Sequence, residues 1–263
     1  MKDFFTASLW AEALKGRHSK VPWLTALGIS LAPLIGGVFM FILKNPERAK
    51  SMGLITTKAQ LTAGVADWPT FLSLLVYTIA VGGAILFALV TAWLFGREFS
   101  DRTVKELLAL PTPREVIISA KFIWLVLWAA GVMVSVFGLH LLVGVLVVLP
   151  GWSQSLLWSA AGDLLATTAL TLALMPPVAL LASAGRGYLP PLGWAILTMA
   201  LGQIVTMIGW GAWFPWAVPA LFSGMAGSRS DQIGWYSYVV VAMVCAAGLA
   251  ATYVWWLKAD HTR

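Results

Sequence analysis

Apolar residues occur along this chain in long continuous runs, not in the alternating pattern of strands that face lipid. The runs cover Val21–Leu43, Phe71–Phe95, Phe122–Leu149, Leu156–Ala184, Leu189–Trp213 and Tyr236–Leu257. Each run of roughly 22–29 residues would form a helix of about 33–43 Å, enough to cross a hydrocarbon core of about 30 Å. Backbone polar groups in lipid must be satisfied within the segment. The pattern therefore predicts an all-α integral membrane protein, a six-helix transmembrane bundle.

Prolines indicate where this bundle is interrupted. The pairs Pro176–Pro177 and Pro190–Pro191 flank Arg186, and each pair must bend or end a helix. Between the last two runs, residues 213–222 combine two prolines with several aromatic residues, which favour the membrane interface. We expect residues 211–224 to form a broken, re-entrant outer segment.

Composition agrees with the membrane assignment. The 263 residues are 60% hydrophobic and 11% charged, with a mean hydropathy of +0.85. Soluble domains are about one quarter charged and disordered chains are polar, so both classes are excluded. The net charge of +6 does not point to nucleic acid, because membrane proteins use Lys and Arg to set their orientation. We expect no nucleic-acid partner. The single cysteine, Cys245, excludes an internal disulfide.

The basic residues fall unevenly on the two sides of the predicted bundle. Twelve lie on one side: Lys2, Lys15, Arg17, Lys20, Arg97, Arg102, Lys105, Arg114, Lys121, Arg186, Lys258 and Arg263. Five lie on the other: Lys44, Arg48, Lys50, Lys58 and Arg229. The positive-inside rule predicts a multi-pass protein of the cell membrane with both termini, including the tail 258–263, in the cytoplasm. The loop 44–58 is unusually basic for an outer segment.

The residues before the first span predict a separate element. Residues 2–19 place apolar side chains such as Phe5 and Leu9 on one face and charged ones such as Glu12 and Lys15 on the other. This spacing predicts that 1–20 is a short interfacial helix on the cytoplasmic surface. The alternative is a frayed basic tail. The first span is too long for a signal peptide.

The longest cytoplasmic connection, 96–121, contains two predicted helix starts. Thr103 and Glu106 have the spacing of a capping box, which predicts a short helix that runs through Leu110. A second box, from Thr112 to Glu115 with proline at the first helical position, predicts the start of the third span.

Charges of both signs distinguish this loop from a simple topological anchor. Positive charge alone would explain Arg97, Arg102 and Lys105, but acidic residues contribute little to topology. Acids nevertheless alternate with the bases, and Leu107–Leu108 adds an apolar ridge. We therefore favour a protein-docking surface over an anchor that only fixes orientation.

These features resemble the first cytoplasmic loop of ABC-2 type permeases, the membrane subunits of ABC exporters. The resemblance rests on Arg97-Glu98, on Arg102-Thr103-Val104-Lys105-Glu106-Leu107-Leu108, on Pro111 and Pro113-Arg114, and on Lys121. It extends to the architecture: an entry helix, a six-span permease domain over 21–257, and the outer segment. The subgroup of bacitracin and lantibiotic self-protection permeases is the most similar.

The resemblance implies a function and a set of partners. The loop would be the coupling helix, docked on a separate ATPase subunit that holds ATP and magnesium, with no cofactor in this chain. A second copy or a related permease would complete the transporter, which would export a hydrophobic or amphipathic substrate such as a peptide antibiotic. The implied contact residues are Glu98, Asp101, Arg102, Lys105, Glu106, Leu107 and Arg114.

Two polar residues within the spans are candidates for a contact in the membrane. His140 in the third run and Asp163 in the fourth could lie at similar depth on antiparallel helices and pair. Such a pair could contact substrate or a proton. It could also be structural, or Asp163 could reach interfacial water.

Other functions have little support in the residues. The chain lacks the Gly-x-x-x-x-Gly-Lys-Ser/Thr and His-Glu-x-x-His patterns and the Gly-x-Ser-Gly of a rhomboid-like protease, so we expect neither catalysis nor a metal site. Two alternatives remain. One is an ion-coupled secondary transporter, for which midplane charges are scarce. The other is a non-transporting membrane assembly subunit.

Overall fold

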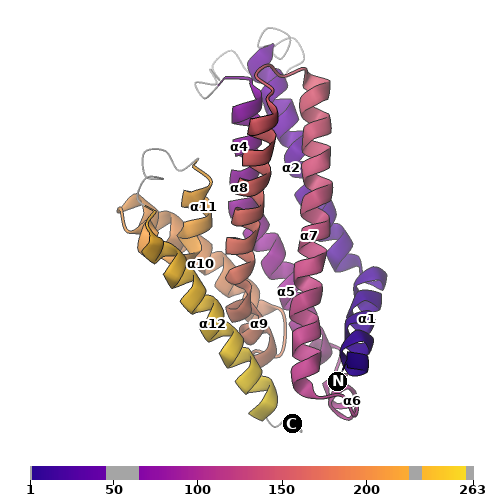
Figure 1. Cartoon of the computed structure of the whole chain (residues 1–263). Helices are drawn as coiled ribbons and strands as arrows, with labels where there is room; N and C mark the ends of the chain where they lie inside the picture. The colour runs from indigo at the N-terminus through magenta and orange to yellow at the C-terminus, as the bar shows by residue number, and fades with distance from the viewer. Residues whose placement is uncertain (1, 46–64, 225–232, 259–263) are drawn as a thin grey trace.

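The computed structural model describes residues 2–45, 65–224 and 233–258, and this part of the chain is a helical bundle without strands (Figure 1). The long helices are α2 (Lys20–Lys44), α4 (Trp68–Thr78), α5 (Ala84–Ser100), α7 (Arg114–Val147), α8 (Gln154–Ala173), α9 (Met175–Ala184), α10 (Leu189–Met207) and α12 (Trp235–Lys258). The others are α1 (Lys2–His18), α6 (Val104–Leu108) and α11 (Val218–Phe222), with short turns η1 (Ile79–Gly83), η2 (Gly211–Trp213) and η3 (Pro215–Ala217).

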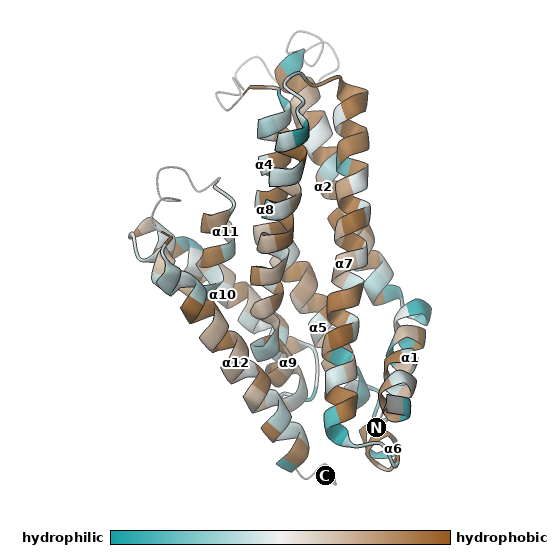
Figure 2. Cartoon of the chain, viewed as in Figure 1, coloured by the Kyte–Doolittle hydropathy of each residue, from teal (hydrophilic) through white to brown (hydrophobic). Residues whose placement is uncertain are grey.

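The prediction of six spans is confirmed. Within the described ranges, six continuous helical segments are long and apolar enough to cross a membrane, and α7 and α12 are hydrophobic over most of their length (Figure 2). The second segment, Trp68–Ser100, extends beyond the predicted run at both ends. The third, Arg114–Val147, begins before the predicted run and ends two residues before its predicted end at Leu149. The fifth is shorter than predicted, since α10 ends at Met207. Gly209 adopts a φ of +89° there, and Trp210 N donates to Val205 O, which closes the helix in a Schellman motif.

Two spans contain internal irregularities. Pro176 and Pro177 stand in the first turn of α9, so the fourth span bends at Leu174, as the prolines predicted. The π-helical turn η1 between α4 and α5 was not predicted. Such turns insert one residue into a helix and often lie at functional sites.

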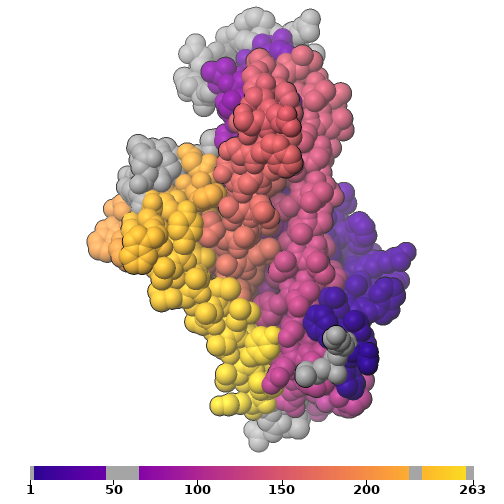
Figure 3. Space-filling view, viewed as in Figure 1, coloured from indigo at the N-terminus to yellow at the C-terminus, as the bar shows by residue number. Residues whose placement is uncertain are grey.

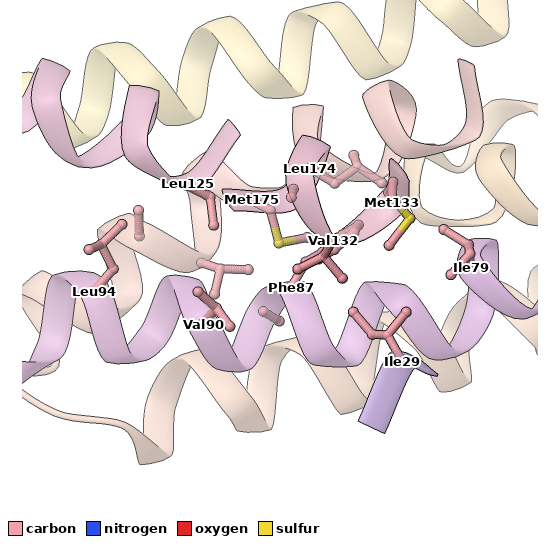
Figure 4. Close-up of a cluster of buried hydrophobic side chains, with 14 of the residues drawn as sticks. Ile29, Ile79, Phe87, Val90, Leu94, Leu125, Val132, Met133, Leu174 and Met175 are labelled. Carbon is pink, nitrogen blue, oxygen red and sulfur yellow. The ribbon is translucent and has the colours of Figure 1, made fainter. Parts of the chain in front are cut away.

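The core is made where the bent spans meet. Leu174 and Met175 pack against residues of α5 and α7, including Phe87 and Val132 (Figure 4). α12 packs closely on the bend, because a side chain at Gly248 would lie 2.6 Å from Pro177. The kink is therefore a packing surface for three other spans, the second, third and sixth.

The start of α1, α6 and the end of α12 lie at the same end of the bundle (Figure 1). We call it the loop end, and the opposite one the far end. α1 forms a helix as predicted and packs beside the first turns of α7 (Figure 3). Its position on a membrane surface stays a prediction. The predicted basic residues Arg48, Lys50, Lys58 and Arg229, and the tail after Lys258, lie outside the described residues.

The segment 211–224 is broken into short pieces, as its prolines predicted. η2, η3 and α11 follow one another, and Trp216 packs edge-on against Trp194 of α10 with ring centroids 5.5 Å apart. Whether this segment re-enters a membrane stays a prediction.

Candidate functional site

The loop between the second and third spans is a compact turn built around α6. α5 ends in a Schellman motif: Thr103 N donates to Glu98 O, and Arg102 takes the left-handed conformation with a φ of +59°. Thr103 is the N-cap of α6, but its side chain makes no capping hydrogen bond. α6 ends at Leu108 instead of Leu110. A residue before a proline disfavours helix, which explains the early end before Pro111.

The second predicted cap also differs. Pro113 occupies the N-cap position of α7 with a ψ of 135°, and Arg114 is the first helical residue. The proposed box with proline at the first helical position is therefore wrong. A prolyl N-cap has no side-chain acceptor for the first amides of the helix.

The middle of the loop exposes charges of both signs. Asp101, Arg102, Lys105 and Glu106 are all exposed. The predicted apolar ridge is partly covered by the chain itself, since Leu107 and Leu108 are half-buried and pack against the main core cluster. The ridge thus attaches α6 to the bundle, while the four charged side chains named above face outward.

Glu98 is not part of that exposed surface. Its side chain is 4% exposed, and its Oε1 atom lies 2.8 Å from Lys121 Nζ and 3.1 Å from Lys15 Nζ. The expectation that Glu98 would contact a partner is therefore corrected: the side chain is buried, and its Oε1 already pairs with two lysines of this chain.

Glu98 belongs to a buried ion network that the sequence did not reveal. Glu12 Oε1 lies 2.7 Å from Lys15 Nζ and 3.3 Å from Lys121 Nζ. Lys121 is fully buried and also donates to Leu94 O at 2.8 Å. Two acids and two bases thus join α1, α5 and α7 in a balanced set of charges. Removing one partner of a buried pair leaves an uncompensated charge, so breaking this network should strongly destabilise the packing of the three helices.

Arg114 is likewise engaged within the chain. Its guanidinium donates to Trp256 O at 3.0 Å and to Leu257 O at 3.5 Å. A cation at a helix C-terminus is favourable, because the last carbonyls there carry a partial negative charge. Arg114 therefore ties the start of α7 to the end of α12, and its contact with a partner stays a prediction.

The turn that precedes α10 packs against the last turns of α5. A side chain at Gly96 would lie 3.1 Å from Gly187 O, so glycine permits this close approach. Burial raises the pKa of the Tyr188 phenol, although a hydrogen bond with Ser100 opposes the shift. The end of α5 is thus held from both sides.

The structure does not bring His140 and Asp163 together. His140 is buried, its Nε2 lies 3.0 Å from Phe71 O, and its ring stacks on Phe71 with centroids 3.6 Å apart. Asp163 is exposed on α8, and no ion pair or hydrogen bond joins these two described residues. The predicted pair is therefore wrong, and His140 serves the packing of α4 on α7.

A cavity of about 290 Å³ lies next to the π-helical turn. Its walls come from the second, fourth and fifth spans and from the 211–224 segment. They are mostly apolar, with polar side chains at Tyr77, Thr171, Thr198, Gln203 and Thr206.

Comparison with known proteins identifies the class of this membrane bundle. Residues 8–202 match the family model described as ABC-2 family transporter protein, and this chain belongs to that family. It is also 29% identical over 192 residues to the bacitracin transport permease protein BCRB of Bacillus licheniformis, a match covering 73% of this chain and 91% of the relative. No solved structure gave a significant match. The family indicates a non-catalytic membrane subunit and implies an ATPase partner.

Proposed function

We propose that this chain couples ATP hydrolysis in a separate subunit to export, with the loop end in the cytoplasm and the ATPase docked on α6. The observation that carries the proposal is the outward set of Asp101, Arg102, Lys105 and Glu106 on a turn fixed between two spans. Charges of both signs at a protein surface specify a partner by electrostatic complementarity. ATP and magnesium would belong to the partner.

The internal contacts of the loop supply a route for movement. A push on α6 acts on α5 through their shared backbone turn and on the core through Leu107. Glu98 then links α5 to α1 and α7 through Lys15 and Lys121. In this proposal the three helices move together when the ATPase changes shape.

The cavity beside η1 suits a substrate with apolar and polar parts, because Gln203 and Thr198 lie among apolar wall residues. We propose a hydrophobic or amphipathic substrate such as a peptide antibiotic, in agreement with the bacitracin transport of the named relative. A second copy of the chain, or a related permease, would complete the transporter.

The test uses Glu106→Lys, with Asp3→Lys as the matched control, because both acids are exposed at the loop end and only Glu106 lies on α6. The chain is co-expressed with the candidate ATPase, and three quantities are measured: co-purification, ATP hydrolysis and survival in bacitracin. We expect Glu106→Lys to weaken association at least tenfold, or by at least about 1.4 kcal/mol, because the reversed charge would oppose a group that complements Glu106.

The control should retain association, hydrolysis and survival. Equal retention of the ATPase by both variants would contradict docking on α6. Survival in bacitracin without any ATPase would contradict the exporter itself and favour the ion-coupled alternative.

A further inference from the structure

An apolar groove of about 560 Å³ runs along the outside of the bundle, between the start of α2 and the part of α7 that follows Lys121. It lies beside the last turn of α1. Its apolar walls are strongly exposed: Trp23 is 60%, Leu27 63% and Leu127 56% accessible. The groove is separate from the cavity beside η1 and from the outward charges of α6.

The aromatic walls of this groove are held in place by the chain itself. Trp23 Nε1 donates to Arg17 O at 3.1 Å, which fixes the indole across the junction of α1 and α2. Any side chain at Gly16 would collide with the Trp124 ring, so α1 presses directly on that ring. Trp124 and Trp128 are stacked with an interplanar angle of 18°. A groove with such fixed walls is formed before a ligand arrives, and less ordering opposes binding.

The length of the groove matches one half of a membrane. Its lining on α7 runs from Trp124 to Ser135. At about 1.5 Å per residue this stretch covers about 16 Å, close to half of a hydrocarbon core of about 30 Å. Gly131 leaves the groove open, because a Cβ atom added at this position would have no neighbouring atom within 4 Å.

The mouth of the groove is positively charged. Arg17 is the one ionisable residue among those that line it. Arg17 is exposed, and its guanidinium makes no hydrogen bond or ion pair with the described residues. Lys20 and His18 are exposed beside it. A free cation above an apolar slot is complementary to a molecule with an anionic head and a hydrocarbon tail.

We propose that this groove binds an anionic phospholipid from the leaflet at the loop end, with its phosphate on Arg17 and one acyl chain between α2 and α7. Trp23 lies at the depth of the headgroup, where indole rings are favoured. The site requires that the chain spans a membrane, but it does not depend on the ATPase or on export. A lipid there would fill the space between the α1–α2 junction and α7.

The test is native mass spectrometry of the purified full-length chain with added phosphatidylglycerol or phosphatidylcholine of identical acyl chains. We expect the wild type to bind phosphatidylglycerol about fivefold more tightly, the effect of about one basic residue near a lipid surface. Arg17→Gln, at an exposed position, should bind both lipids equally. Gly131→Phe should lose both, because the ring would fill the groove.

Gly162→Phe is the matched control, since Gly162 of α8 is equally open and lies outside the groove. It should bind lipid as the wild type does. Three results would overturn the proposal: wild-type lipid binding by Gly131→Phe, an unchanged preference in Arg17→Gln, or full displacement of the lipid by inorganic phosphate. The same spectra report oligomeric state, and a dimer that Gly131→Phe converts to monomers would instead make the groove an interface between copies.

Discussion

In the loop between the second and third spans, the charged side chains at the two flanks point in a different direction from those in the middle. At the flanks, Glu98, Lys121 and Arg114 turn inward and bond to other helices of the chain. In the middle, Lys105 and Glu106 point outward on α6. The same residue types therefore serve cohesion at the flanks, whereas we propose that they serve recognition in the middle.

This contrast separates two kinds of mutational effect. A change at the flanks should act mainly on the free energy of unfolding, because it breaks contacts inside the molecule. A change in the middle should leave stability nearly unaltered and act on binding of the ATPase, because exposed charges contribute little to folding. A flank variant that weakened only ATPase binding, or a middle variant that lowered only stability, would show that the flanks and the middle are not distinct.

The largest expected effect is that of Lys121→Met. This change leaves the buried acids Glu12 and Glu98 to share one cation, Lys15, so one buried negative charge is uncompensated, and breaking a buried pair costs about 3–5 kcal/mol. Unfolding in detergent, followed by circular dichroism during a denaturant titration, measures the loss. Lys105→Met removes the same side chain from the exposed middle of the loop and should stay within about 0.5 kcal/mol of the wild type.

The pair Glu98→Gln with Lys121→Met should recover part of that loss. Glu12 would keep Lys15 at 2.7 Å, so the network would again balance one acid with one base. An unaltered loss in the double variant would mean that Lys121 stabilises by packing and not by charge. A wild-type value in Lys121→Met alone would refute the network.

Much of the fold follows from the sequence, because length and hydropathy alone define a helix that crosses a membrane. The bend at Pro176–Pro177 follows from missing backbone donors. The end of α10 at Met207 was missed, although Gly209 two residues later is a typical end signal. The π-helical turn has no comparable sequence signature.

The position of the candidate site along the chain was predicted, but the contacts of its individual side chains were not. The position of α6 between two spans follows from its charges and prolines. Which charges turn inward depends on α1, a helix more than 80 residues away in the chain, as the Lys15–Glu98 pair shows. Pairing between residues so far apart in the chain cannot be deduced from one sequence alone. The one local indication was Lys121 itself, a lysine between Ala120 and Phe122 within a mostly apolar stretch.

A smaller loss of stability is expected for Arg114→Met. The two carbonyls at the end of α12 would lose their cationic donor, at a cost of about 1 kcal/mol for a half-buried position. The same denaturant titration detects it. Arg114→Lys keeps a positive charge near these carbonyls and should lose less. If Arg114→Met instead abolished ATPase association with stability intact, Arg114 would belong with the outward middle of the loop.

The smallest effect has the opposite sign and comes from Arg102→Gly. Arg102 holds a left-handed φ of +59°, which glycine adopts without strain, so the variant should gain about 0.5–1 kcal/mol of stability. It should also weaken ATPase association, because an outward cation is lost. Arg102→Ala is the control, since it removes the charge but keeps the strain: association should fall equally, with no gain in stability. A gain in stability with full association would show that the side chain of Arg102 has no part in docking, and the middle of the loop would then owe its recognition to Asp101, Lys105 and Glu106.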